Sequence, residues 1–294
     1  MDSQTEVTPE AVHAPPAVTT PADRAGAQPR IGSDAPFYTG MILIGGFYVF
    51  MIFAMLVADL KYTSVPHLVA ALRSPEIQYS IKLSLITCTF TTLLSLWVAV
   101  PLGYLLSRHK FPGCSLVDAL LDIPIVLPPL VVGLSLLILF QTPLFHRIEQ
   151  FVPVTFAIPS VILAQFMVAA AFAVRTMRVT FDQIPIRQEQ VALTLGCTRS
   201  QAFFHVVLPQ ARKGMITAAT LAWARALGEF GPILIFAGAT RGRTEVLSTS
   251  VYLEFSVGNI DAAVAVSLLM IATSVAVLIA MRSFGLTGFW KKAT

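Results

Sequence analysis

The sequence predicts an all-α membrane protein with six transmembrane helices. Of its 294 residues, 55% are hydrophobic and only 12% are charged, and the mean hydropathy is +0.75. Soluble domains carry about a quarter charged residues, so this chain is too apolar to be one. The hydrophobic residues also come in blocks of roughly 20 or more, the length of helix that crosses a hydrocarbon core of about 30 Å.

The hydrophobic blocks predict where the spans lie. We expect one helix in each of six segments, at about 38–60, 80–106, 117–140, 156–174, 214–238 and 258–281. The longest polar loop, residues 175–213, lies between the fourth and fifth spans. With the N-terminus inside, the inner segments hold about twice as many Lys and Arg residues as the outer ones. The positive-inside rule therefore places both termini and this loop in the cytoplasm of a protein of the plasma (inner) membrane.

The segment before the first span differs from the rest in composition. Residues 1–36 are rich in Pro, Ala and Thr and hold no apolar run, which predicts a disordered cytoplasmic tail. The pattern of a signal peptide is absent at the N-terminus, so we expect the first helix to stay uncleaved. The first helix and an outer loop should then occupy 37–75, a core 76–282 and a cytoplasmic tail 283–294.

Residue types that bind metals or nucleotides form no pattern in this chain. The three cysteines have no paired spacing, and the five histidines are scattered without ligand spacing. A Gly-rich phosphate loop is also absent from the sequence, so ATP would have to bind to another protein. We therefore expect no catalytic residue, no metal and no cofactor in this chain.

Prolines mark the third predicted span, where Pro128 and Pro129 stand five and four residues before Gly133. A proline removes a backbone hydrogen bond, and a membrane tolerates this only where other helices or a water-filled cavity satisfy the freed carbonyl. Two interpretations are open. The three residues belong to a bent helix packed in the bundle, or they shape the wall of a translocation pathway.

The loop at 175–213 carries the most specific pattern. A short helix should run from Glu189 to Gly196, and a second from about Arg199 to Val207, where Pro209 follows. The second helix has an apolar surface that should face the cytoplasm, made of Phe203, Phe204, Val206 and Val207. Exposed apolar surface of this kind indicates a docking site.

This stretch resembles the EAA loop of ATP-binding-cassette (ABC) importer permeases. The family pattern is Glu-Ala-Ala, three residues, Gly, nine residues, Ile, any residue, Leu-Pro. Aligned on the glycine, the chain matches at Ala192, Gly196, Val206 (for Ile), Leu208 and Pro209. It departs at Gln190 and Val191, where the family has Glu and the first Ala, although Glu189 lies one position earlier.

The resemblance covers about residues 80–281 and implies the type I importer permease fold, with the ABC permease core at 76–282. In the family this loop inserts into a groove of the nucleotide-binding subunit. The resemblance thus implies that Gly196 permits the bend and that Ala192 and Phe203 lie near the ATPase.

A second stretch resembles the molybdate and sulfate permeases. It reads Leu227-Gly-Glu-Phe-Gly231, then Phe236-Ala-Gly238, and later Arg243-Thr244. The chain departs from these permeases at Pro232 and over 248–252. This resemblance implies an oxyanion such as molybdate, tungstate or sulfate as the transported solute.

Two opposite charges lie inside the fifth predicted span. Arg225 and Glu229 are four residues apart and would share one helix face. Either charge alone would cost about 3 kcal/mol at a helix centre, so we expect the two to pair or to face a watery cavity. A structural pair and a role in the gate or pathway are both open.

The resemblance implies a transport subunit rather than an enzyme. Such a permease forms half of a translocation pathway and needs a second permease copy or a related permease. ABC ATPase subunits that bind ATP and magnesium, and an extracytoplasmic solute-binding protein, complete the importer. A secondary transporter of an anionic or small polar solute is the alternative, because the charged pair could serve an ion-coupled site. A non-transporting membrane scaffold is a third.

Overall fold

The computed structural model describes residues 34–290, with side chains for all of these except residues 36, 65, 282 and 284–290. Every regular element within this range is a helix, which confirms the predicted fold class. The chain divides into two units, residues 1–55 and 56–294. The predicted disordered tail lies outside the described residues, except for its last three positions.

The first unit contains most of helix α1 (Ala35–Tyr62). Its large apolar side chains, such as Ile44, Phe47 and Tyr48, are exposed. A helix this long and apolar meets the requirement for a membrane span, with the residues Phe37–Tyr62 counted as the candidate.

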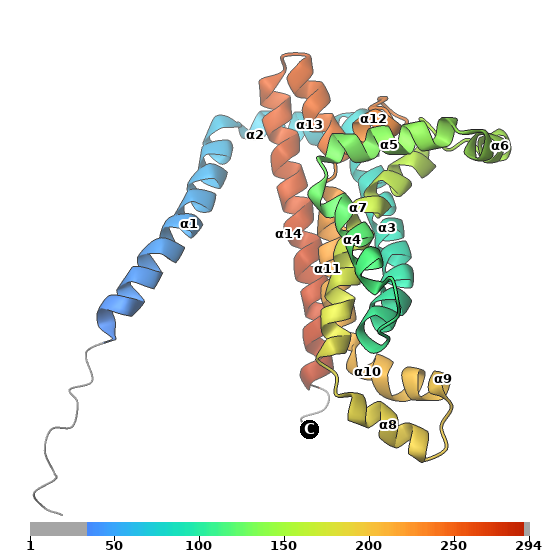
Figure 1. Cartoon of the computed structure of the whole chain (residues 1–294). Coiled ribbons are helices and arrows are strands. Elements are labelled where there is room, and N and C mark those ends of the chain that lie inside the picture. The colour runs from blue at the N-terminus through green and yellow to red at the C-terminus, as the bar shows by residue number, and fades with distance from the viewer. Residues whose placement is uncertain (1–33, 291–294) are drawn as a thin grey trace, which may run out of the picture. The chain divides into compact units, whose positions relative to one another are not determined.

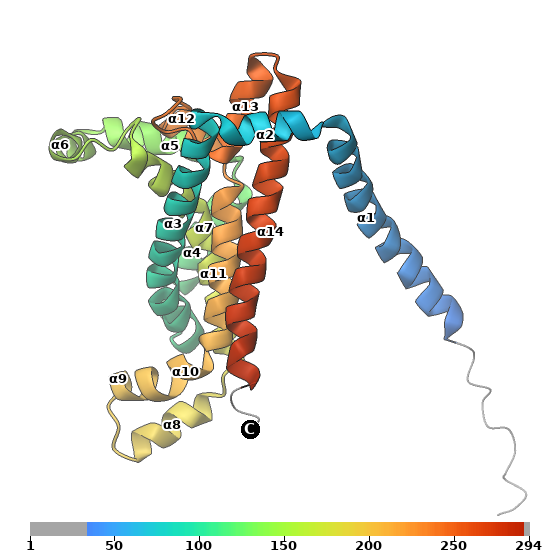
Figure 2. The same ribbon diagram turned by 180° about the vertical axis from the view of Figure 1, so that it is seen from behind.

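The second unit is built around long helices that run side by side in Figures 1 and 2. They are α3 (Pro75–Arg108), α7 (Ile158–Asp182), α11 (Arg212–Leu227) and α14 (Ile260–Trp290). With α1, three of them (α3, α7 and α14) are long and apolar enough to cross a membrane, and a bent pair adds a fifth candidate if it counts as one span. The fifth predicted span, over 214–238, therefore remains a prediction.

The bent pair replaces the continuous helix that we predicted over 117–140. Helix α4 (Cys114–Val126) and helix α5 (Pro129–Gln141) meet at an angle of 113°. Leu127 and Pro128 between them are in extended conformations, because a residue that precedes a proline is driven out of the helical region. The prolines thus break this helix and do not merely kink it.

The core of the unit depends on small side chains. Helix α7 buries Ala169, Ala170, Ala171 and Ala173, and α11 buries Ala218, Ala222 and Ala226. On α3, a Cβ atom at Gly103 would lie 2.9 Å from the backbone nitrogen of Arg178, so only glycine fits there. Small residues allow helix backbones to approach closely, which is how helices associate in a membrane.

Polar side chains also join the helices inside this core. Thr91 of α3 donates a hydrogen bond to the side chain of Gln165 of α7, and the Ser84 hydroxyl accepts one from the backbone N–H of Leu247. These bonds satisfy polar groups that neither lipid nor water can reach.

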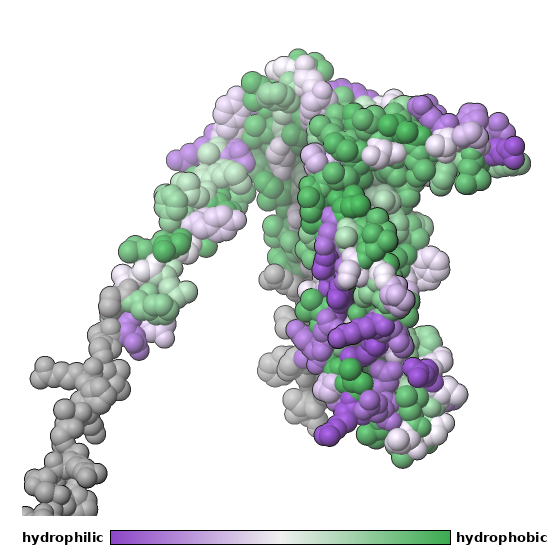
Figure 3. Space-filling view, viewed as in Figure 1, coloured by the Kyte–Doolittle hydropathy of each residue, from purple (hydrophilic) through white to green (hydrophobic). Residues whose placement is uncertain are grey.

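Short helices gather at the two ends of the long ones. One end carries α8 (Ile186–Thr194), α9 (Arg199–Ala202) and α10 (Leu208–Gln210), and the other carries α2 (Val65–Arg73), α6 (Pro143–Phe151), α12 (Gly231–Phe236) and α13 (Leu247–Ser256). Figure 3 shows that hydrophilic side chains concentrate at the end that carries α8 and α9. The C-terminal end of α14 lies at this same end.

Candidate functional site: the coupling loop and the charged pairs

The loop between α7 and α11, residues 183–211, has the predicted order of helix, break and helix, and we call it the coupling loop. Helix α8 ends at Thr194, and Gly196 just beyond it has a φ of +90°, in the left-handed region that favours glycine. Helix α9 begins with a capping box, in which the Thr198 hydroxyl accepts from the N–H of Gln201 and the Gln201 side chain accepts from the N–H of Thr198. These two devices set the angle between the short helices.

A π-helical turn, Phe203–Val207, follows α9 directly. The turn leads into α10, whose second residue is Pro209. A proline has no N–H to donate, so the regular hydrogen-bond ladder is interrupted at this point. Such turns are frequent at functional sites.

Glu189 is buried against the transmembrane bundle. Its Oε1 accepts a hydrogen bond from the Tyr104 hydroxyl of α3 at 2.5 Å, and its Oε2 lies 3.5 Å from the Nε of Arg108. The same Arg108 donates from Nη2 to the carbonyl oxygen of Ile184 at 2.9 Å. Because Tyr104 and Arg108 both belong to α3, these contacts join the coupling loop to a long helix of the bundle.

An aromatic cluster reinforces this junction. The Phe203 ring lies 4.8 Å from the Tyr104 ring and 6.3 Å from the Phe181 ring of α7, centroid to centroid. We name the set of Glu189, Tyr104, Arg108 and Phe203 the α3 junction. Side chains from two parts of the coupling loop therefore pack on one turn of α3.

These contacts correct the apolar surface that we predicted for the second short helix. Of its four residues only Phe204 is exposed, whereas Val207 is buried and Phe203 and Val206 are half-buried. Ala192, expected near the ATPase, is also buried. Phe203 packs on the rings of Tyr104 and Phe181, and Val207 belongs to the same hydrophobic cluster.

Apart from Phe204, the exposed apolar residues of the loop are ones that sequence reasoning missed. Val191 and Leu195 of α8 are exposed, as is Ile186 at its start. The spacing of four between Val191 and Leu195 could have shown a shared face, opposite to the one that buries Glu189 and Ala192. Gln190, the departure from the family pattern, is exposed too, while the neighbouring carboxylate points inward.

The break between α4 and α5 brings Gly133 against α12. A Cβ atom at Gly133 would lie 2.7 Å from the Cα of Pro232, and one at Gly231 would lie 3.1 Å from the Cβ of Pro129. Close backbone approach explains why both positions are glycine. The structure thus shows close packing at Pro129 and Gly133, whereas Pro128 is exposed, and both interpretations of the three residues stay open.

The predicted pairing of Arg225 with Glu229 is confirmed. The Nη2 of Arg225 lies 2.6 Å from the Oε1 of Glu229, without hydrogen-bond geometry. The pair differs from the prediction in one respect, because α11 ends at Leu227 and Glu229 lies in the link to α12. The Glu229 side chain is 1% exposed and that of Arg225 30% exposed, so the two charges have unequal access to water.

Two further ion pairs join α7 to α4, and sequence reasoning missed them. Arg175 pairs with Asp122, and Arg178 pairs with Asp118. We placed both arginines in a loop, but α7 continues to Asp182, so they lie on its last turns. The matching spacing, three residues between the arginines and four between the aspartates, could have suggested this pairing.

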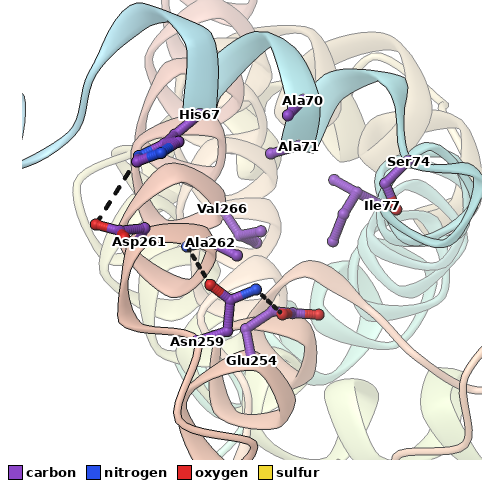
Figure 4. Close-up of a pocket in the computed structure, with 10 residues that line it drawn as sticks. All are labelled: His67, Ala70, Ala71, Ser74, Ile77, Glu254, Asn259, Asp261, Ala262 and Val266. Atoms are coloured by element: carbon purple, nitrogen blue, oxygen red, sulfur yellow. Dashed lines mark hydrogen bonds and ion pairs between the residues drawn. The ribbon is translucent and has the colours of Figure 1, made fainter.

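A polar pocket lies at the other end of the second unit, between α2 and the α13–α14 turn (Figure 4). The Nδ1 of His67 lies 3.9 Å from Asp261, and Asn259 donates a hydrogen bond to Glu254 at 3.2 Å. Glu254 also pairs with Arg241 at 2.8 Å. The polar groups of the pocket therefore bond mainly to one another, and no predicted site residue lines it.

Comparison with known proteins decides the family. Residues 99–286 match the family model described as the inner membrane component of binding-protein-dependent transport systems. The chain belongs to this family. It is therefore an integral membrane permease subunit of an ABC importer and not an enzyme, and the family works with an ATPase and a substrate-binding protein. This excludes the secondary-transporter and scaffold alternatives.

The permease is similar to several characterised relatives. It is 38% identical over 175 residues to the molybdate/tungstate transport system permease protein WtpB of Thermococcus kodakarensis, a match that covers 60% of this chain and 67% of that protein. Identity to the sulfate transport system permease protein CysT of Salmonella typhimurium is 30% over 213 residues, with 71% and 77% covered. Identity to the molybdenum transport system permease protein ModB of Escherichia coli is 35% over 185 residues, with 62% and 80% covered.

A solved structure shares the fold of the permease. A chain of the bacterial alginate ABC transporter, in complex with its alginate pentasaccharide-bound periplasmic protein, superposes with a TM-score of 0.68 at 16% identity. The match covers 84% of the permease and 93% of that chain. At this identity the likeness concerns the fold alone.

Proposed function

We propose that the permease imports an oxyanion of the molybdate, tungstate and sulfate class. The observation that carries this proposal is its similarity to molybdate/tungstate, molybdenum and sulfate permeases, at 30–38% identity over 175–213 residues. The segment from Leu227 to Gly231, which resembles these permeases, contains the buried carboxylate of the charged pair.

Uptake by the whole importer tests the solute class. The permease, reconstituted in vesicles with its ATPase and binding protein, should take up radiolabelled molybdate or sulfate when ATP is inside. Unlabelled tungstate should compete, and a sugar should not. ATP-driven uptake of a solute that is not an oxyanion, with none of these anions transported, would contradict the proposal.

We propose that two permease chains, this one twice or with a related permease, enclose the pathway. Two ATPase subunits that bind ATP and magnesium sit on the cytoplasmic side, and the binding protein docks outside. The concentration of hydrophilic side chains at the coupling-loop end supports placing this end in the cytoplasm. We propose that both termini lie on the same side, as the distribution of Lys and Arg residues along the sequence indicates.

The coupling loop is the element that we propose for contact with the ATPase. Exposed Val191, Leu195 and Phe204 supply the apolar surface for docking, with Gln190 beside them. The α3 junction then carries the movement of the loop into the bundle. Buried and hydrogen-bonded contacts suit this role, because packed groups move together.

The pathway or gate is proposed at the contact of α5 with α12, near the charged pair. Pro128, Pro129 and Gly133 set the direction of α5, and the link that carries Glu229 leads directly into α12. A break in helical structure at membrane depth is tolerated where backbone lines a cavity or is buried in protein. Arg225, the more exposed member of the pair, is the residue that an entering anion can meet.

A further inference from the structure

Helix α6 has one apolar face that the rest of the second unit does not cover. Leu144, Ile148 and Phe151 follow one another at spacings of four and three, which places them on one side of the helix. Their exposed fractions are 69%, 48% and 86%. His146 and Gln150 lie on the opposite side and are exposed as well.

The orientation of this helix is fixed by contacts at its other edges. The Phe145 ring packs on the Phe140 ring of α5, with centroids 5.3 Å apart. The Oε1 of Glu149 accepts a hydrogen bond from the backbone N–H of Thr155 at 3.0 Å, which ties the helix to the segment that follows it. The exposed apolar face is therefore held pointing away from the packed interior.

Helix α6 lies across the direction of the long helices. Figures 1 and 2 both show it end-on, whereas α3 and α14 run up the page. It stands at the end of the bundle that carries α2 and α13. If the long helices cross the bilayer, α6 is parallel to the membrane plane at the level of their outer ends.

An apolar hollow of the long helices reaches the elements on either side of α6. The hollow between α3 and α7 beside α6 is lined by apolar side chains, among them Trp97, Phe140, Val154 and Ile158. Phe140 touches α6, and Val154 follows it in the chain. In Figure 3 the lower edge of the projection that holds α6 is mostly hydrophobic, and hydrophilic side chains lie along its upper edge.

We propose that α6 lies in the outer interface of the bilayer, with Leu144, Ile148 and Phe151 inserted at the boundary between headgroups and acyl chains. Amphipathic helices adopt this position when a narrow apolar face meets a polar one. The occupant is lipid because the hydrophobic edge of the projection that holds α6 is the one on the side of the long apolar helices. Charge contributes little to the binding of α6 to lipid, because the helix carries Arg147 and Glu149 of opposite sign. In this position α6 holds α5, and with it the bend after α4, to the membrane plane.

Spin labels on the two faces test the proposal. The full-length permease, with Cys88, Cys114 and Cys197 replaced by alanine, receives one nitroxide at Ile148→Cys or Phe151→Cys, with His146→Cys and Gln150→Cys as controls. All four positions are exposed, so the label should leave the fold unchanged, and uptake by each labelled importer checks this. Collision rates with oxygen and with a water-soluble nickel chelate are measured in phosphatidylcholine vesicles.

We expect oxygen to dominate at 148 and 151 and the nickel chelate to dominate at 146 and 150, each by several-fold. Adding phosphatidylglycerol should change neither ratio. Equal access of the nickel chelate to all four positions would overturn the proposal by placing α6 in water. Exclusion of both reagents at 148 and 151 would overturn it by showing that protein covers the face. A contrast that appears only with phosphatidylglycerol would overturn it by showing that charge holds the helix.

Discussion

Gly196 shows how a single residue sets the geometry of the coupling loop. Its φ of +90° ends α8, and no other atom lies within 4 Å of the place where a Cβ would stand. The glycine is therefore required by backbone conformation and not by lack of space. Any residue with a Cβ must strain this turn or move α9 relative to α8.

We expect Gly196→Val to impair coupling. The left-handed conformation costs a residue with a side chain about 1–2 kcal/mol, so the turn should adopt another shape and displace the docking surface. ATPase activity and uptake of the reconstituted importer measure the effect. Gly258→Val, at a φ of +82° in the α13–α14 turn, is the matched control for strain alone. Unchanged substrate-stimulated turnover in Gly196→Val would contradict this role.

The Tyr104 hydroxyl provides a direct test of the α3 junction. Tyr104→Phe keeps the ring on Phe203 but removes the donor to Glu189, and a hydrogen bond to a charged group is worth about 1.5–3 kcal/mol. We expect the amount of solute moved per ATP hydrolysed to fall several-fold. Tyr79→Phe is the control, because Tyr79 donates to the Arg243 carbonyl near the other end of α3. The same coupling ratio in both variants would rule out transmission through the junction.

The two members of the charged pair should differ in how much their loss reduces assembly of the complex. Glu229 is almost fully buried, so Arg225→Gln should reduce the amount of folded complex more than Glu229→Gln, because it leaves the carboxylate unpaired. Loss of one partner of a buried pair costs about 3–5 kcal/mol. The double replacement removes both charges and should restore assembly.

Uptake by the double variant, normalised to the folded complex in the membrane, then separates packing from transport. We expect normal assembly with reduced uptake, because Arg225 would no longer face the anion. Normal uptake would leave the pair a purely structural role.

The phase of α8 illustrates what sequence reasoning could not reach at the residue scale. The pattern from Glu189 to Pro209 identified the loop, its bend and its glycine. It could not show that Glu189 points toward α3, because Tyr104 and Arg108, more than 80 residues earlier in the chain, decide this. Three of the four apolar residues of the second short helix were wrongly expected to be exposed, because their burial depends on rings supplied by other helices.

The contact between α5 and α12 shows how element boundaries depend on tertiary packing. Hydropathy predicted a single span over 117–140, because a sliding average reports apolar content and not backbone direction. Prolines marked the position where the helix breaks, but the angle of 113° and the docking of α5 on α12 could not be deduced from the sequence. By contrast, the predicted spans at 80–106 and 258–281 correspond to long continuous helices, although Pro101 lies inside the first of them.

We expect Gly133→Ala to weaken this contact. The added methyl would overlap Pro232, and overpacking of this kind costs about 1–3 kcal/mol. The apparent melting temperature of the purified permease should fall by about 5 °C. Gly228→Ala, where the nearest atom would be at an ordinary 3.7 Å, is the control. Equal melting temperatures for the two variants would contradict the close approach of α5 and α12.

At the scale of the whole molecule, the arrangement of short helices predicts which end of the bundle faces the cytoplasm. The coupling loop and the end of α14 share one end of the bundle, and α13 lies at the other. A variant with Cys88 and Cys114 replaced by alanine keeps Cys197 in the coupling loop as its single thiol.

This thiol should react with a membrane-impermeant maleimide only after cells are opened. A second variant, with all native cysteines replaced and Ser256→Cys at the end of α13, should react in intact cells. Reaction of Cys197 in intact cells would reverse the orientation that we propose.

The pairing of charges across the bundle also affects how long an anion can stay bound inside the permease. Arg108, Arg175, Arg178 and Arg225 each lie within 3.5 Å of a carboxylate of the same chain. Because these arginines are already paired with carboxylates, they would bind a divalent anion only weakly. Passage requires that a solute bind weakly enough to leave. A permease with neutralised arginines would therefore release its solute quickly, and selection among solutes would fall to the protein that delivers it.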